Sequence, residues 1–295
     1  MSHPIEGLIC LDKPSGQSSH DVVNAVRRLA GIRRVGHAGT LDPLASGLLL
    51  VCLGRATRLL EYLIGQPKTY LAKVRLGQET STYDAEGEIT AEHRVEISRQ
   101  QLAAALDKFR GVIEQQAPMY SAVKVAGQPL YRRARKGESV ERPVRTVTVY
   151  QLDLLAWQES LLALRIHCSS GTYIRSIAHD LGRDLGCGAF LAGLRRTGVG
   201  RFSLADAAPI AALDQDGWRR HLRPADVAVA HLTRLDVTED EALTLYHGQT
   251  VPRQAGQTGE SPVRVYDESG LFVGVCAADA QQWRPQKILY QPGQG

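Results

Sequence analysis

The chain of 295 residues is long for one domain and suits two. Its content of 43% hydrophobic and 22% charged residues is that of an ordinary soluble globular protein. The net charge of +4 permits a polyanionic partner without requiring one. Residues 230–295 hold five Lys/Arg and eight Asp/Glu, a net charge of −3, so residues 1–229 carry +7. We therefore expect any polyanion to bind mainly to the first 229 residues.

Several classes of protein find no support in the sequence. The five cysteines are scattered and form no Cys-x-x-Cys pair, which argues against a zinc site or a disulfide framework. The sequence holds no compact cluster of metal ligands and no glycine-rich nucleotide-binding motif, so we expect neither a metal nor a cofactor. No signal peptide or membrane-length apolar run is present. These features predict a protein of the reducing cytoplasm without membrane association.

The first elements in chain order are a short apolar strand over residues 7–11 and a helix. Ser18 and Asp21 form a capping box that begins this helix, and Gly31 is a natural end for it. Four arginines lie at its end or just past it: Arg27, Arg28, Arg33 and Arg34. They suit either a solvated helix end with cations favoured by the dipole or contacts to phosphates.

The following stretch, residues 36–47, contains three glycines and a proline, which excludes a regular helix or strand. Six apolar residues, 48–53, come directly after it and predict a buried strand. Pro43 biases Asp42 toward an extended backbone, which would fix the direction of its carboxylate. An Asp-Pro pair beside glycines is by itself also typical of an ordinary turn.

The next elements are a short helix over residues 55–64 and an alternating strand over residues 69–76 that carries Tyr70. A tyrosine on a strand is most often half-buried core. Residues 77–87 form a polar, acidic loop. Ser98 and Gln101 form a capping box for a helix that continues to Arg110.

Residues 117–145 are the most basic stretch of the chain. Seven cations lie here against two glutamates: Lys124, Arg132, Arg133, Arg135, Lys136, Arg142 and Arg145. Tyr120 and Tyr131 are interleaved with them. Phosphates can take the charge and bases the ring faces, so the pattern suits nucleic acid, although a solvated basic helix fits equally well.

Paired strands over residues 144–155 and 161–168 lead into a helix that begins near Tyr173. Arg175 lies in its first turn, where the helix dipole disfavours a cation. An anionic partner or a surface position would explain this placement. Residues 191–196 precede another expected strand over residues 197–204, and Leu194 would ordinarily be core.

The C-terminal part of the sequence begins with residues 205–229, which have the prolines and acidic turns of a linker. Thr238 and Glu241 form a third capping box, and a hairpin over residues 263–275 follows the helix that they begin. By itself this tail indicates only a small β-rich module.

The stretch Gly-His-Ala-Gly-Thr-Leu-Asp-Pro-Leu-Ala-Ser-Gly at residues 36–47 resembles the catalytic loop of pseudouridine synthases of the tRNA pseudouridine synthase B type. Further matches, such as Gly-Thr-Tyr-Ile-Arg at 171–175, extend the resemblance over nearly the whole chain. It implies an α+β fold with a mixed, mainly antiparallel sheet around a central cleft. Residues 1–229 would form the catalytic domain, with a thumb-like RNA-binding insertion at about 117–145, and residues 230–295 a small β-rich PUA domain.

The same resemblance implies the activity: isomerisation of uridine 55 in the T-loop of tRNA to pseudouridine, by a protein that we expect to be a monomer. Asp42 would be the nucleophile, Arg175 the cation that keeps it ionised and Tyr70 the ring that stacks on the flipped base. The resemblance also implicates Tyr70 in the removal of the C5 proton. The other implied substrate contacts are His37, Tyr173, Leu194 and Lys13. Lys124, Arg132, Arg133, Arg135 and Lys136 would hold the T-loop and stem.

Two other functions compete with this one. A guide-RNA-directed relative shares the catalytic loop but works with protein partners, and the basic insertion and short tail favour the stand-alone enzyme over it. A tRNA-folding helper with secondary catalysis would bind RNA without needing turnover. The net acidic tail leaves its own share of RNA binding open.

Overall fold

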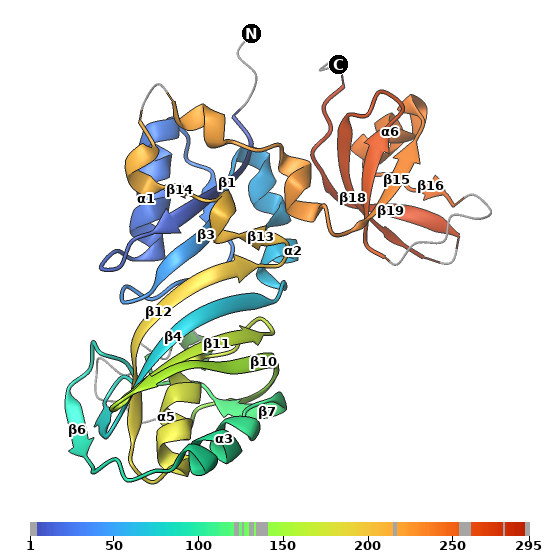
Figure 1. The fold of residues 1–295 in the computed structure, drawn as a ribbon. Helices are drawn as coiled ribbons and strands as arrows, with labels where there is room; N and C mark the ends of the chain where they lie inside the picture. Colours follow the sequence, from blue (N-terminus) through green and yellow to red (C-terminus); the bar gives the residue numbers. More distant parts are fainter. Residues whose placement is uncertain are drawn as a thin grey trace.

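The computed structural model describes residues 5–120, 124–125, 127–129, 133, 141–214, 217–253, 261–279 and 281–292. Its main feature is a ten-stranded sheet in the order β14-β1-β3-β12-β4-β11-β10-β7, with β2 paired to β3 and β13 to β12 (Figure 1). The pairs β1–β14 and β3–β12 are parallel and the others antiparallel. The expected α+β class and mixed, mainly antiparallel sheet are confirmed.

The strands of this sheet are β1 (Gly7–Lys13), β2 (Val35–His37), β3 (Ser46–Leu53), β4 (Lys68–Leu76), β7 (Gly111–Gln116), β10 (Val144–Gln158), β11 (Leu161–Cys168), β12 (Ala189–Val199), β13 (Phe202–Ser203) and β14 (Ala208–Pro209). Two small pairs lie apart from it: β5 (Gln78–Thr80) with β6 (Ile89–Glu92), and β8 (Lys124–Val125) with β9 (Gln128–Pro129).

Strand β3 is buried on both faces, which explains its unbroken apolar sequence. Leu48, Leu50 and Cys52 pack toward the short helices η1 (Gly54–Leu59), α2 (Leu60–Ile64) and η5 (Ala225–Val229). Leu49, Val51 and Leu53 pack toward helix α1 (Ser19–Ala30) on the other face. The capping box of Ser18 and Asp21 and the left-handed Gly31 bound α1 as predicted. The catalytic-loop candidate thus leads directly into the most buried strand.

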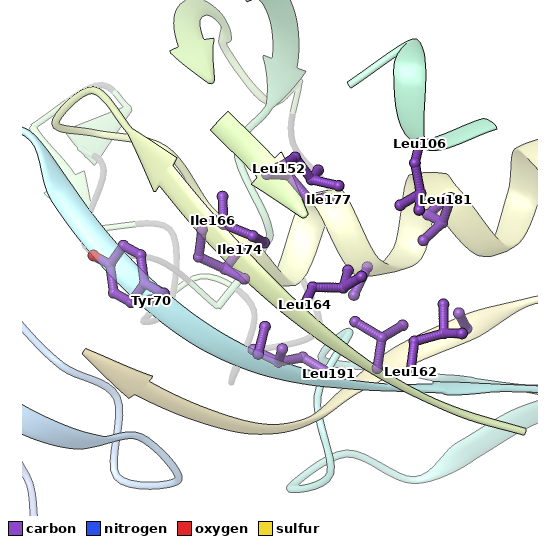
Figure 2. Close-up of a cluster of buried hydrophobic side chains, with 14 of the residues drawn as sticks. Tyr70, Leu106, Leu152, Leu162, Leu164, Ile166, Ile174, Ile177, Leu181 and Leu191 are labelled. Carbon is purple, nitrogen blue, oxygen red and sulfur yellow. The ribbon is translucent and has the colours of Figure 1, made fainter. Parts of the chain in front are cut away.

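The other half of the sheet packs against helices α3 (Arg99–Asp107) and α5 (Ile174–Asp184). Tyr70, Ala72, Val74 and Leu76 lie on the buried face of β4, as its alternation predicts. Figure 2 shows this core, with Tyr70 at one end of β4 and residues of β11 and α5 beside it. Leu41 and Ala45 of the 36–47 stretch belong to the same cluster, so this core positions the candidate loop.

Three expectations about local structure are wrong. Residues 191–196, expected to precede a strand, lie within β12, and the strand expected over 197–204 is divided between the end of β12 and β13, which a tight turn connects. Residues 205–229 are no linker: β14 pairs with β1, while Trp218, Ala228 and Val229 are buried in the core. In the 36–47 stretch, β2 extends to His37 and β3 begins at Ser46, so only its centre is irregular.

The C-terminal residues form a second sheet in the order β15-β17-β18-β19-β16, with helix α6 (Glu239–Tyr246) packed on it. Its strands are β15 (Thr233–Val237), β16 (Val251–Pro252), β17 (Val263–Asp267), β18 (Phe272–Ala278) and β19 (Gln282–Ile288). The capping box of Thr238 and Glu241 and the 263–275 hairpin are as predicted. The expected β-rich C-terminal domain is therefore present (Figure 1).

This second sheet packs against η1 and α2 of the first part. Arg58 Nη1 donates to the carbonyl of Ile288 at 2.7 Å, and Lys287 Nζ lies 2.7 Å from Glu61 Oε1. Val275 and Leu289 are buried in the same apolar cluster as Leu48 and Leu50. All five cysteines are buried and unpaired. In the part of the chain that the structure describes, no helix is long and apolar enough to span a membrane.

Candidate active site

Residues 38–45 form the irregular loop between β2 and β3, and Asp42 lies at its turn. The Asp42 carbonyl accepts a hydrogen bond from Ala45 N at 3.0 Å. Ser19, the first residue of α1, donates to the carbonyl of Leu41 at 3.0 Å and accepts from Leu41 N at 2.8 Å. The residue before Asp42 is therefore held by both of its backbone polar groups, which fixes where the carboxylate begins.

Lys13 holds the other side of this loop from the end of β1. The side chain is fully buried, and Nζ donates to the carbonyls of Gln17 at 2.6 Å, Pro14 at 2.9 Å and Pro43 at 3.5 Å. Burial lowers the pKa of this amine, while the nearby Asp42 carboxylate acts in the opposite direction. Composition indicated only a turn here. The structure makes Lys13 a buried support of the loop.

Arg196 is a support that the sequence analysis did not single out. It is 1% exposed, and its guanidinium donates to the carbonyls of Leu48 at 2.8 Å and Gly39 at 3.0 Å. It therefore ties β12 to β3 and to the loop. In the sequence, a Leu-Arg-Arg run looks solvated, and only the pairing of β12 between β3 and β4 buries it.

Arg175 lies where α5 begins and meets two carboxylates. Its Nε is 3.1 Å from Asp42 Oδ2, and its Nη1 is 3.2 Å from Asp84 Oδ2. The side chain is only 8% exposed, and Nη2 also donates to the carbonyl of Tyr120 at 2.8 Å. The anionic partner suggested by its unfavourable place on the helix is thus present twice.

Asp42 is the more open of the two carboxylates, with 41% of its side chain exposed. Removal of water by the surrounding protein nevertheless raises the pKa of Asp42, and Asp84 acts in the same direction. Arg175 and then Lys13 lower it. The two cations thus favour the ionised form that a nucleophile needs.

Asp84 is a second residue of the site that the sequence analysis missed. It is 2% exposed and accepts from Thr82 Oγ1 at 2.5 Å and from Glu86 N at 3.1 Å, in addition to Arg175. In sequence it is one of several acidic residues in a polar loop, and that context is typical of a solvated turn. In the sequence, the one signal for Asp84 is Arg175, whose place in the first turn of a helix calls for an anionic partner.

Tyr70 and Leu194 lie on neighbouring strands at the same end of the core. Tyr70 is 8% exposed and shares an apolar cluster with Leu41 of the loop, and Leu194 packs against that cluster while partly exposed. Burial raises the pKa of the Tyr70 phenol, and the nearby Arg196 acts against this rise. The Tyr70 phenol is therefore protonated at neutral pH.

Tyr173 and His37 complete the residues placed near the loop. Tyr173 is the N-cap of α5, and the buried Gln115 side chain bonds both its N–H, at 3.0 Å, and its carbonyl, at 3.2 Å. His37 ends β2, and its Nδ1 is buried without a partner among the described residues. Burial and the charge of Arg196 lower the pKa of His37, so its ring is neutral at pH 7.

The expected RNA contacts at 117–145 are mostly outside the described residues. Arg132, Arg135 and Lys136 lie there, as does the side chain of Lys124, whose backbone is in β8. Arg133 is described and half-buried. Within the described ranges, no three His, Cys, Asp or Glu side chains are grouped so that they could hold a metal ion.

Comparison with known proteins gives the same family from residue 27 to residue 289, apart from residues 231–232. The N-terminal domain of the TruB family pseudouridylate synthases matches residues 27–174. The tRNA pseudouridylate synthase B C-terminal domain matches residues 175–230, and the C-terminal domain of pseudouridine synthase II TruB matches residues 233–289.

Curated relatives and solved structures agree with this assignment. The tRNA pseudouridine synthase B of Azoarcus sp. (strain BH72) is 41% identical, covering 97% of this chain and 95% of the relative. That of Pseudomonas aeruginosa (strain UCBPP-PA14) is 43% identical, covering 97% and 96%. A chain of a Cbf5-Nop10-Gar1 complex superposes with a TM-score of 0.76 at 27% identity, covering 96% of this chain and 85% of that one. The chain therefore belongs to the TruB family of pseudouridylate synthases.

Proposed function

We propose that this protein isomerises uridine 55 in the T-loop of tRNA to pseudouridine, with Asp42 as the nucleophile. The observation that carries the proposal is the pair of Asp42 and Arg175, 3.1 Å apart, on a loop held from three sides in a TruB-family chain. Relatives named as tRNA pseudouridine synthases at 41–43% identity favour tRNA as the substrate.

The reaction balances without any external reactant. The N1–C1′ glycosidic bond of the uridine breaks, the uracil rotates, a new C5–C1′ bond forms, and the C5 proton is lost while N1 gains one. Asp42 would form a covalent intermediate with the sugar or with the base, and its carboxylate is released when the new C5–C1′ bond has formed. Arg175 keeps that carboxylate ionised before the attack and stabilises it when it returns.

Tyr70 would support the flipped uracil by stacking, with Leu194 and Tyr173 lining the same pocket and His37 beside the nucleotide. Stacking requires no ionisation, so the neutral buried phenol suits that role. Tyr70 could accept the C5 proton only as a phenolate, which the neighbouring Arg196 favours and burial disfavours. Lys13 would act through the loop that it holds.

The remaining parts of the proposal concern the RNA and the assembly. Residues 1–229 would form the catalytic domain, and Lys124, Arg132, Arg133, Arg135 and Lys136 would grip the T-loop and stem. Residues 230–295 would form a PUA domain with a minor share of the binding, because that part is net acidic. We propose a monomeric cytoplasmic enzyme that uses no metal or cofactor.

The test is tritium release from tRNA labelled at C5 of uridine, with purified protein and no cofactor. We expect release by the wild type, and none by Asp42→Asn or from tRNA in which uridine 55 is replaced. Binding of tRNA by Asp42→Asn should be nearly unchanged, because only one charge is lost. A matching loss of binding would argue against Asp42 as the nucleophile.

The same assay separates the competing functions. Tight binding of tRNA without release would identify a folding helper. Release that needs an added guide RNA and protein partners would identify a guide-directed enzyme. The likeness to an H/ACA RNP structure, at 24% identity and a TM-score of 0.74, shows a shared fold alone.

A further inference from the structure

Two aromatic rings pack beside the Asp84–Arg175 pair and take no part in the proposed chemistry. The rings of Tyr83 and His179 are stacked, with centroids 3.8 Å apart and planes 9° from parallel. Tyr83 directly precedes Asp84, and His179 follows Arg175 by four residues on α5. Residues four apart lie on the same face of a helix. The same face of α5 therefore meets the Asp84 carboxylate through Arg175 and the adjacent ring through His179.

The backbone of Tyr83 has an unusual conformation. Its φ of 66° lies in the left-handed region, which residues other than glycine rarely adopt. Tyr83 N donates to the carbonyl of Thr80 at 3.2 Å, and the Tyr83 carbonyl accepts from Leu191 N at 3.0 Å. A tyrosine thus occupies a position where glycine would be less strained. The stacking of its ring on His179 is an interaction that glycine could not make there.

A third residue holds the stacked ring from the side of the basic stretch. Arg142 Nη1 donates to Tyr83 Oη at 3.3 Å, and its Nη2 donates to Gln116 Oε1 at 2.6 Å. On His179, Nδ1 is buried without a hydrogen-bond partner among the described residues. Burial lowers the pKa of His179, so the stacked ring is neutral at pH 7. The two rings therefore make a contact between neutral groups, and the hydrogen bond from Arg142 holds the hydroxyl of Tyr83.

We propose that Tyr83 and His179 are positioning residues, whose stacked rings set the Asp84 carboxylate against Arg175 and so align Arg175 with Asp42. This inference rests on the proposed function, because its effect is read as a rate of isomerisation. It requires that the rings act through Asp84. A ring that only fills space would affect folding but not the rate of the bound complex.

The first test is the single-turnover rate of tritium release with saturating tRNA. Tyr83→Gly relieves the left-handed backbone and removes the ring, and we expect the rate to fall about 10-fold, since misplacement of a catalytic group is costly. His179→Ala should lose a similar factor. Tyr83→Phe and His179→Phe keep a stack and should keep most of the rate. The Kd for tRNA should change by less than about 2-fold in all four.

Glu159→Gly is the matched control, because Glu159 is the other non-glycine residue with a left-handed φ in the described part of the chain, at 51°. It lies in the turn between β10 and β11, away from the site. We expect a wild-type rate from this variant. Thermal unfolding of Tyr83→Gly must also show a folded protein at the assay temperature, and His179→Ala provides a second route to the same loss.

A double-variant cycle tests whether the stack acts through Asp84. In an Asp84→Asn background, measured over long incubations, Tyr83→Gly should cause less than about a 2-fold further loss, because the group that it positions is already removed. A full additional 10-fold loss would overturn the proposal, as would wild-type rates for Tyr83→Gly and His179→Ala. Absence of release by the wild type would instead refute the proposed function.

Discussion

At the scale of the residue, burial of Asp42 opposes the ionisation that its proposed role as a nucleophile requires. Its pKa in the folded protein is raised above the ordinary 3.8, first by burial and then by Asp84. Between 3.8 and the raised value, the folded state binds more protons than the unfolded state. The stability of the fold therefore decreases as pH rises through this window, and the full cost is present at neutral pH.

Asp42→Asn should for this reason increase stability while it abolishes activity. We expect a higher urea midpoint than wild type at pH 7.5 and a smaller gain at pH 5, because the wild-type carboxyl is closer to protonation there. Equilibrium unfolding followed by tryptophan fluorescence measures both. Asp153→Asn, on β10 outside the site, is the control and should show no such gain. A lower midpoint for Asp42→Asn would contradict a raised pKa.

The rate should depend on pH through the same group. Asp42 attacks as a carboxylate, so the single-turnover rate should fall as pH decreases through a pKa above 3.8. Asp84→Asn removes a negative charge that raises this pKa, and the acid limb of its residual activity should move to lower pH. A limb displaced to higher pH in Asp84→Asn would show that Asp84 stabilises the ionised form of Asp42 through Arg175.

At the scale of the element, β3 and β12 determine whether the loop can form. They pair in parallel at only two positions, Ser46 with Arg195 and Gly47 with Arg196. A Cβ on Gly47 would lie 2.2 Å from the carbonyl oxygen of Arg196, and the φ of Gly47 is +103°. The close approach of these two strands brings the Arg196 guanidinium to the loop, so it depends on a glycine.

Gly47→Ala should therefore be far more harmful than Gly16→Ala. A Cβ on Gly16, whose φ is +86°, meets no atom within 4 Å. We expect a loss of about 1 kcal/mol in the free energy of unfolding for Gly16→Ala, from backbone strain alone. For Gly47→Ala we expect a loss of about 4 kcal/mol, because overpacking against the backbone is added. Urea unfolding measures the loss in each variant. Equal losses would show that β12 can move away from the added Cβ at little cost in free energy.

The elements that depend on local signals could be predicted from the sequence. The capping boxes at Ser18, Ser98 and Thr238 are all present, because each needs only residues three apart. Strand β7 was missed, since its sequence Gly-Val-Ile-Glu-Gln-Gln is half polar. The burial of Arg196 and Asp84 depends on pairings between distant segments. The loop with Asp42 could be found because its residues are contiguous, and Arg175 could be found from its motif and its place on the helix, whereas Arg196 and Asp84 could not.

At the scale of the whole molecule, charge is divided between two parts that share a core. Val275 and Leu289 of the C-terminal part are buried against β3, and Tyr62 Oη donates to Gln286 Oε1 at 3.0 Å. The net charge of −3 on residues 230–295 is thus held close to the +7 of the remainder. An RNA would be attracted to one side of the molecule and repelled from the other, which would orient its approach.

The salt dependence of tRNA binding tests where that attraction arises. Replacing Arg132, Arg133 and Arg135 by Gln should weaken binding and reduce the slope of log K against log salt by about 2 to 3, because each phosphate contact releases counterions. The control replaces three exposed arginines that already pair with carboxylates: Arg94, Arg234 and Arg284. Their charges are locally balanced, so the slope should change by less than about 1. Filter binding between 50 and 300 mM salt, roughly the range in which such contacts are lost, measures both variants. Equal slopes in the two variants would mean that net charge, rather than the 117–145 stretch, governs the binding of tRNA.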